Sequence, residues 1–199
     1  MRRVSDAWGF SRLCGERAIC ERCGENMKHK FAVQLYTLRN ELANDFPGTL
    51  RRLKDMGWEA VQIDGLFGYS AAEIGAVLKE TGLSAAGMHI GLDRMNHELD
   101  AVLEEARLFG ARDIFCHYLE EDMQHPDGYR QAKRELLATA GKVNPHGIRV
   151  GYHHHEFEFL STVDGMTAFD YLMAPEGNRF LYPEVDTYWE IGRASCRER

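Results

Sequence analysis

The segment YHHHEFEF, residues 152–159, places three histidines and two glutamates within eight positions of the chain. About thirty residues later, the segment EVDTYW at residues 184–189 adds two more carboxylates at the end of another apolar run. Neutral imidazole and carboxylate oxygen suit divalent Zn, Mn, Fe or Co, and no thiolate lies nearby to favour a structural zinc site. The two segments therefore predict metal-assisted chemistry.

Both ends of the chain differ from the part that carries these segments. Residues 1–26 are rich in Arg and Cys, lack an apolar run long enough for a signal peptide, and are followed by Met27, which reads as a natural start. The segment IGRASCRER, residues 191–199, back-translates into a common sequencing adapter, and Glu190 is mostly adapter-coded as well. We therefore expect a non-native leader over residues 1–26, a body over 27–189 and an adapter-derived tail over 190–199. The natural protein would then continue past Trp189, which makes this chain a fragment.

The body is more acidic than the whole chain, whose formal net charge is −7. Residues 27–189 hold 16 Lys and Arg against 25 Asp and Glu, a net charge of −9. Such a balance argues against nucleic-acid partners and for a small-molecule substrate. The body has no apolar run of membrane-spanning length, and its one cysteine, Cys116, fits a reducing cytoplasm. We therefore predict a cytoplasmic protein with no membrane partner, and homo-oligomerisation is left open.

The body alternates short apolar segments with longer amphipathic ones. Strands are predicted at residues 31–38, 58–64, 83–90, 113–118, 148–155 and 180–186, and helices at 50–57, 70–82, 97–110, 129–143 and 166–173. Gly82 and Gly110 follow two of these helices, as C-terminal cap glycines do. No two predicted strands are close enough to form a hairpin. The pattern is therefore a βα repeat with parallel strands.

Two architectures fit such a repeat, the open doubly wound sheet and the closed eight-stranded barrel. The open sheet usually carries a glycine-rich phosphate loop after its first strand, and QLYTLRNEL at residues 34–42 has no glycine. We therefore predict an α/β fold, an incomplete (β/α)8 TIM barrel with about six of its eight units present.

Barrel enzymes place their active sites at the carboxyl ends of the strands, where this sequence is rich in polar residues. Alternation along the fifth strand points His153 and His155 to one face and His154 to the other, where a hydrogen-bonded core histidine is expected. Glu158 lies just past that strand, and Asp186 is either a ligand or a cap of the next turn. The strand-end residues expected to converge are Gln34, Tyr36, Gln62, Asp64, His89, His117, residues 153–158 and Asp186.

Aromatic side chains near the same strand ends can pack against the C–H faces of a sugar. The candidates are Trp58, Phe67, Tyr69, Tyr188 and Trp189, about half of which we expect in the core instead. A sugar-sized pocket is therefore a further prediction.

With these motifs identified, the body resembles the sugar phosphate isomerase/epimerase family of xylose isomerase-like barrels. The resemblance is carried by YHHHEFEF, EVDTYW, the early QLYTLR and the segment GLSAAGMHIGL, and it spans nearly all of residues 27–189. It implies a (β/α)8 barrel that binds one divalent cation, Mn, Mg, Zn or Co, through carboxylates and a histidine from strands five to eight.

The resemblance also implies roles for individual residues. Asp186 matches the strand-six ligand, and strand five should supply another ligand. Many relatives have glutamate at the position of His153, so His153, His155 and Glu158 all remain candidates, of which we favour Glu158. The predicted assignments are as follows: metal ligands Glu158 and Asp186; catalytic residues Glu158 and His155; substrate-binding residues Gln34, Tyr36, His89, His153 and Trp189.

The implied reaction is proton transfer next to the carbonyl of a sugar or sugar phosphate, through an enediolate, in a divalent-metal-dependent isomerase or epimerase. Loss of hydroxide from the same intermediate would instead make an inosose dehydratase-like lyase. An abasic-site endonuclease and a non-catalytic sugar-binding barrel share the architecture and stay as alternatives. The fragment itself is expected to be inactive.

Overall fold

The computed structural model describes residues 30–189, and six parallel strands form its main sheet. The leader and the tail predicted from the sequence lie outside these residues, and so do residues 27–29 at the start of the predicted body. The strand order is β1-β2-β3-β4-β5-β8, so strands adjacent in sequence are adjacent in space. The strands span Val33–Gln34, Ala60–Asp64, Ser84–Ile90, Asp113–Cys116, Arg149–His153 and Tyr182–Glu184.

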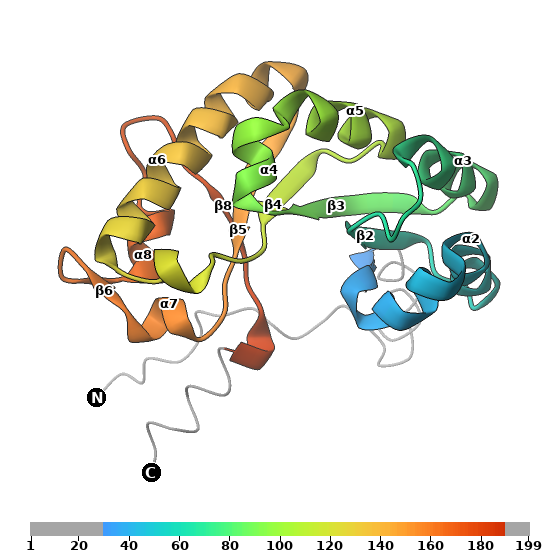
Figure 1. Ribbon diagram of the computed structural model, residues 1–199, viewed down its shortest axis with the longest axis horizontal. Coiled ribbons are helices and arrows are strands. Elements are labelled where there is room, and N and C mark those ends of the chain that lie inside the picture. Colours follow the sequence, from blue (N-terminus) through green and yellow to red (C-terminus); the bar gives the residue numbers. More distant parts are fainter. Residues whose placement is uncertain (1–29, 190–199) are drawn as a thin grey trace, which may run out of the picture.

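Helices connect the strands and cover the outer face of the sheet. In Figure 1, helices α2, α3, α5 and α6 follow one another in an arc along one side of the strands. The α-helices are α2 (Arg39–Asp55), α3 (Ala71–Thr81), α4 (Leu92–His97), α5 (Leu99–Phe109), α6 (Pro126–Val143), α7 (Phe157–Leu160) and α8 (Ala168–Met173). This half-barrel with flanking helices confirms the predicted incomplete (β/α)8 fold. No helix within residues 30–189 has both the length and the apolar composition needed to cross a bilayer.

Helix α3 shows how the local sequence sets the boundaries of these elements. Ser70 and Glu73 form a capping box at its start, with the Ser70 Oγ accepting from the Glu73 N–H and the Glu73 carboxylate accepting from the Ser70 N–H. Gly82 ends the helix with a positive φ of 66°, and Gly110 ends α5 with a φ of 70°. Both glycine caps were predicted from the sequence.

The first unit differs from the prediction. The first strand was expected over residues 31–38, but β1 is only two residues long and is followed by a 3₁₀ turn, η2 (Leu35–Leu38). Helix α2 then begins at Arg39 rather than near Leu50, with a non-helical break at Asp45. The Asp45 Oδ1 accepts from the Gly48 N–H at 2.8 Å and so caps the second part of α2. Pro47 is tolerated there because the first turn of a helix needs no donor from it.

A small hairpin after the fifth strand also departs from the prediction that the body has none. Strands β6 (Thr162–Val163) and β7 (Met166–Thr167) pair antiparallel, apart from the main sheet. Asp164 and Gly165 both have positive φ, 50° and 81°, which matches a two-residue type I′ turn. The Asp-Gly pair is a hairpin signal that the sequence interpretation overlooked.

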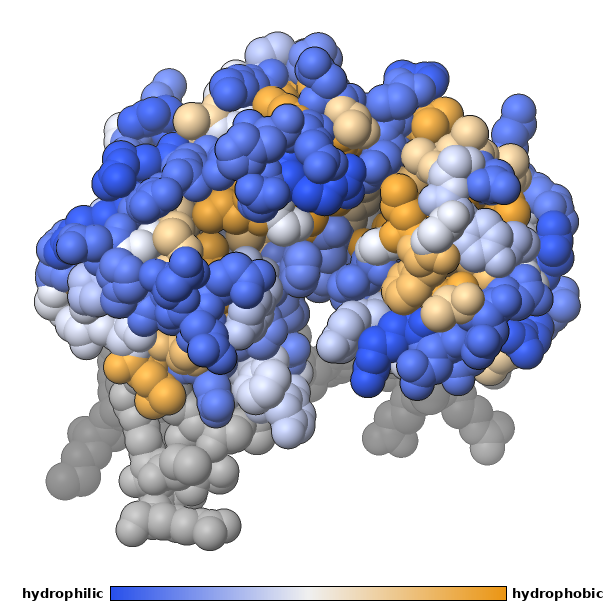
Figure 2. Space-filling model, viewed as in Figure 1, coloured by the Kyte–Doolittle hydropathy of each residue, from blue (hydrophilic) through white to orange (hydrophobic). Residues whose placement is uncertain are grey.

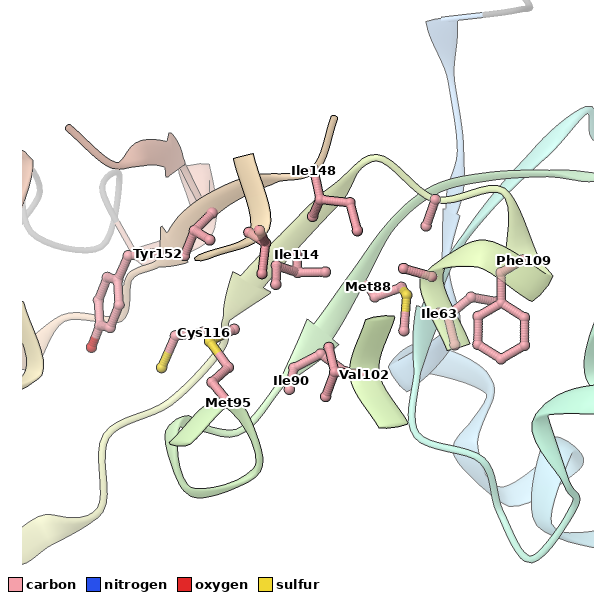
Figure 3. Close-up of a cluster of buried hydrophobic side chains, with 14 of the residues drawn as sticks. Ile63, Met88, Ile90, Met95, Val102, Phe109, Ile114, Cys116, Ile148 and Tyr152 are labelled. Carbon is pink, nitrogen blue, oxygen red and sulfur yellow. The ribbon is translucent and has the colours of Figure 1, made fainter. Parts of the chain in front are cut away.

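Alternation along the central strands divides apolar from polar side chains. One set of positions faces the helices and forms the core with their buried faces, as Figure 3 shows for Ile63, Met88, Ile90, Ile114 and Tyr152 among others. The alternate positions of the same strands carry the polar residues to the inner side of the half-barrel. These include Gln62, Asp64, His89 and His153.

Gly151 lies at one of these inner positions, where the interior is too crowded for a side chain. A Cβ there would collide with the carbonyl oxygen of Tyr182 on β8 and would come within 2.5 Å of the Phe115 ring. We expect Gly151→Ala to destabilise the protein by about 1–3 kcal/mol, because backbone and ring must both move. Urea denaturation measures the loss. The matched control is Gly141→Ala in α6, where nothing lies within 4 Å of the added Cβ and we expect a gain of up to about 1 kcal/mol. Equal effects of the two changes would contradict this account.

Candidate functional site

A cavity of about 1160 Å³ opens at the carboxyl ends of the strands. Residues at or just after the carboxyl ends of β1, β2, β3, β4, β5 and β8 all contribute to its lining, as expected for a (β/α)8 barrel. Figure 2 shows the molecule hollowed between its two sides, with mainly hydrophilic residues around the hollow. Most of the strand-end residues predicted to converge line this one space; they are Gln34, Tyr36, Asp64, His89, His117, His153, His155 and Asp186.

His89 lies at the centre of the polar network in this cavity. Its Nδ1 is 2.9 Å from the Asp64 Oδ2, and its Nε2 is 2.9 Å from the Glu184 Oε2. Burial alone would lower the pKa of His89, but the hydrogen bonds to Asp64 and Glu184 and the charges of these carboxylates raise it to about 9. In this geometry His89 is an imidazolium that bridges two carboxylates.

Two glutamine side chains complete this network. The Gln62 Nε2 donates to the Glu184 Oε1 at 2.6 Å, which joins β2 to β8 through the interior of the half-barrel. The Gln34 Nε2 donates to the Asp64 Oδ2 at 3.2 Å, next to His89. Burial opposes ionisation of Asp64 and Glu184, but hydrogen bonds from His89 and the glutamines lower the pKa of both carboxyls. Both therefore carry negative charge near neutral pH.

His153 is placed between two carboxylates without a hydrogen bond to either. Its Nδ1 lies 3.8 Å from the Glu184 Oε2, and its Nε2 lies 3.8 Å from the Asp186 Oδ2. The Nδ1 atom is buried and has no hydrogen-bond partner. A cation bound at about 2.0–2.2 Å from each ligand fits between two atoms this far apart. Because Nδ1 and Nε2 point in different directions, one cation would use only one of these two pairs.

Ligand atoms of His89, His153 and Glu184 all lie within 4.8 Å of one another. Imidazole nitrogen and carboxylate oxygen are donors that Zn, Mn and Co accept readily, and the unpartnered Nδ1 of His153 is directed toward this group. His153 and Glu184 therefore fit a divalent cation, and His89 would join them only after losing the proton that it donates to Glu184.

Asp186 serves both of the roles that the sequence left open. Its Oδ1 accepts from the Tyr188 N–H at 2.9 Å, which is the capping interaction. Its Oδ2 is the oxygen that faces His153. Asp186, the predicted ligand, therefore lies next to the possible ligands His89, His153 and Glu184, although it is not one of these three.

Glu158 lies outside the cavity. Its side chain is fully buried, with Oε1 accepting from the Tyr152 hydroxyl at 2.5 Å and Oε2 accepting from the His155 N–H at 2.7 Å. The reason is local: helix α7 begins at Phe157 and turns Glu158 back toward Tyr152, on the outward face of β5. Burial outweighs these hydrogen bonds and raises the pKa of Glu158. The structure thus gives the predicted ligand and proton carrier no access to the site.

His155 is exposed to the cavity, as alternation predicted. Its ring stacks on Phe157 with centroids 5.4 Å apart, and Trp189 lies 5.6 Å away. Burial, helped by the nearby His153, lowers the pKa of His155 to about 4, so the ring is neutral near neutral pH. Trp189 is the one aromatic candidate of the five that lines the cavity. Trp58, Phe67 and Tyr69 pack against the core, and Tyr188 is exposed.

His154 points away from the cavity into the space beneath helices α7 and α8. It is fully buried, its Nε2 accepts from the Asp186 N–H at 3.1 Å, and its ring packs against Phe159 and Phe169. The expectation of a hydrogen-bonded core histidine is confirmed. On the cavity side, His117 stacks on His89 with centroids 5.5 Å apart, and burial lowers its pKa.

The remaining predicted substrate residues are split in position. Gln34, His89 and His153 lie together in the network, while Tyr36 is half-exposed at the cavity edge. Glu184 is the site residue that the sequence interpretation missed. A signal was present, because Glu184 precedes Asp186 by two positions and strand alternation puts both on one face.

The fold is that of an incomplete (β/α)8 barrel, and its strand ends carry residues that could hold a divalent cation. A scan against protein-family models gives no match. A search of curated proteins gives no significant match either.

Solved structures do match the chain. A sugar phosphate isomerase/epimerase from Parabacteroides distasonis superposes with a TM-score of 0.69 at 18% identity, over 81% of this chain and 66% of that one. The probable 3-DHS dehydratase AsbF from Bacillus anthracis gives 0.56 at 13% identity, over 81% and 65%. An AP endonuclease of family 2 from Brucella melitensis gives 0.53 at 20% identity, over 63% and 55%. These likenesses show that the chain has the fold of these proteins, and that it spans about two thirds of the length of the first.

Proposed function

We propose that the protein is a divalent-metal-dependent isomerase or epimerase that acts on a sugar by proton transfer through an enediolate. The observation that carries the proposal is the group formed by His89, His153 and Glu184, three potential ligands whose atoms lie within 4.8 Å of one another, two of which, His89 and His153, line the cavity. The similarity in fold to a sugar phosphate isomerase/epimerase structure supports it.

The ligands proposed for the cation are His153 and Glu184, with Asp186 adjacent. His89 would either join them or keep its present role, in which it orients Glu184 through Nε2. When bound, Mn, Mg, Zn or Co would polarise the carbonyl and neighbouring hydroxyl oxygens of a ketose. Gln34, Tyr36, His89, His153 and Trp189 are the proposed substrate-binding residues.

His155 is the proposed proton carrier, because it is a neutral imidazole facing the cavity. Removal of the proton from the carbon next to the carbonyl gives the enediolate, and its return to another face or carbon gives the epimer or isomer. Glu158 then acts indirectly. Its carboxylate holds the His155 backbone at 2.7 Å and so positions the ring.

A dehydratase is the second candidate. Expulsion of hydroxide from the same enediolate would give a lyase, and the fold shared with the probable dehydratase from Bacillus anthracis favours keeping it. The product separates the two, because isomerisation conserves mass and dehydration removes one water. The abasic-site endonuclease is disfavoured, since the described cavity residues include six carboxylates and no Lys or Arg to bind DNA phosphates.

Metal removal tests the proposal. We expect the protein that contains this chain to convert a ketose and to lose that turnover when EDTA strips the metal, with recovery on adding Mn, Mg, Zn or Co. Elemental analysis before and after treatment is the control. Undiminished turnover in a sample shown to be free of metal would refute the mechanism, and metal-dependent sugar binding without turnover would indicate a non-catalytic barrel.

A further inference from the structure

We propose that this site takes an uncharged sugar or polyol and discriminates against its phosphate ester. The inference rests on the proposed function and deepens it by choosing between the two substrate classes. It depends on three observations: the charge of the cavity wall, the partners of the nearby Lys and Arg side chains, and the residues in the first turns of the nearby helices.

The described part of the cavity wall is strongly acidic. Six of its residues are carboxylates and none is Lys or Arg; the six are Asp64, Asp93, Glu120, Asp122, Glu135 and Asp186. A phosphate monoester carries a charge of about −1.5 to −2 at neutral pH. Such a group would meet repulsion from several directions in this cavity. The imidazolium of His89 is already paired with Asp64 and Glu184, and the described wall has no guanidinium or ammonium to offset the repulsion.

Three basic side chains on the surrounding helices, Arg94, Lys133 and Arg39, are engaged elsewhere. Arg94 on α4 pairs with Glu98 and Glu105 at 2.9 and 2.7 Å. Lys133 on α6 is buried and donates to the carbonyl oxygens of two residues near the end of α8. Arg39 lies over the Tyr36 ring, 4.6 Å from its centroid, and donates to the Tyr36 carbonyl oxygen. None of these three side chains lines the cavity.

Helix starts, which often bind phosphate through free N–H groups, do not offer an anion site here. The first turn of α4 carries Asp93, and the 3₁₀ turn η3 begins with Glu121 and Asp122. At the start of α6, the His125 side chain accepts from the Gly128 N–H, and Asp127 lies in the first turn. These carboxylates occupy the positions where an anion would gain from the helix dipole.

The same wall suits hydroxyl groups, which donate to fixed acceptors. The Glu135 carboxylate is held by the Asn96 Nδ2 at 2.7 Å and by the Gln131 Nε2 at 2.8 Å. All three residues line the cavity. The two amides also present oxygen acceptors to the same region. The arrangement is that expected for a ligand that brings many O–H donors and no charge.

The test compares each ketose with its own phosphate ester, using the metal-loaded protein that contains this chain. We expect kcat/KM to be at least about tenfold higher for the free sugar, and the preference to shrink at high salt because screening weakens the repulsion. Calorimetric titration with the same pairs gives the binding preference without requiring turnover. The double variant Asp93→Asn with Glu120→Gln should narrow the preference. Glu41→Gln, which removes a charge from α2 outside the cavity wall, should leave it unchanged.

The outcomes separate the two proposals. Better turnover or tighter binding of the ester would overturn the inference, place a phosphate-binding group outside residues 30–189 and leave the isomerase proposal standing. Tighter binding of the free sugar without conversion of either compound would support the inference and refute the isomerase proposal. Equal use of both compounds at low salt would also overturn the inference.

Discussion

Replacing Glu184 with glutamine should reduce metal content from one equivalent toward none and lower turnover by about 100-fold or more. Glutamine keeps the shape of the side chain; its oxygen can accept from the His89 Nε2–H, and its NH2 can donate to the oxygen of the Gln62 amide once that amide turns over, so the fold should persist. What it removes is the negative charge beside His153, where the cation is proposed. Elemental analysis, steady-state kinetics and circular dichroism measure the three quantities.

Glu156→Gln is the matched control, because Glu156 is an exposed carboxylate two positions before Glu158 that does not line the cavity. It should retain both metal and activity. If Glu184→Gln also retained both, Glu184 would not be a ligand, and the cation would have to bind through other residues, such as Asp186 and His153.

Replacing Glu158 with alanine should cost about 3–5 kcal/mol of stability, one of the largest effects expected in this chain. The change leaves the Tyr152 hydroxyl and the His155 N–H buried without an acceptor and opens a cavity beneath the strand-five turn. Chemical denaturation measures the loss. Glu156→Ala, at the exposed neighbouring position, should change stability by no more than about 0.5 kcal/mol.

The variant Glu158→Gln separates charge from shape. Its amide can donate to the Tyr152 oxygen and accept from the His155 N–H, so the cost should be smaller than that of alanine. Since burial raises the pKa of Glu158 above its ordinary value of 4.5, the folded protein binds more protons than the unfolded chain just above that pH. The contribution of Glu158 to stability therefore falls as pH rises through this window. The stability advantage of wild type over Glu158→Gln should shrink accordingly, and a constant difference would show that the pKa is not raised.

The order of the elements could be predicted because side chains along each central strand alternate between two faces, and each covering helix buries one face. The predictions failed where side chains compete with that periodicity. Gln34 caps the turn at Tyr36 and so shortens β1. Asp45 restarts α2 ahead of Pro47. The Asp164–Gly165 pair makes a hairpin so short that no alternation is visible in it.

The location of the site could be predicted from the sequence, but most of the contacts within it could not. Alternation correctly separated His153 and His155 from His154. It could not show that His89 bridges Asp64 and Glu184, because that contact depends on the register and curvature of β2, β3 and β8. Glu158 was assigned to the site because it lies beside the histidines in the sequence. The intervening start of α7 reverses its direction.

The bond from the Asp186 N–H to His154 fixes where the proton of that imidazole resides. Since Nε2 accepts from Asp186 and Nδ1 lies 3.2 Å from the His155 carbonyl oxygen, the ring is the Nδ1–H tautomer. The last paired residues of β5 and β8 are His153 and Glu184. Beyond that pair, the bond to the His154 imidazole replaces the backbone hydrogen bond that would otherwise join the two strands. A proton on the Nε2 of His154 would remove the acceptor of this hydrogen bond and release the Asp186 backbone from the fifth strand. The tautomer of one buried ring, readable from its ¹⁵N chemical shifts, would therefore report whether the two strand ends are joined.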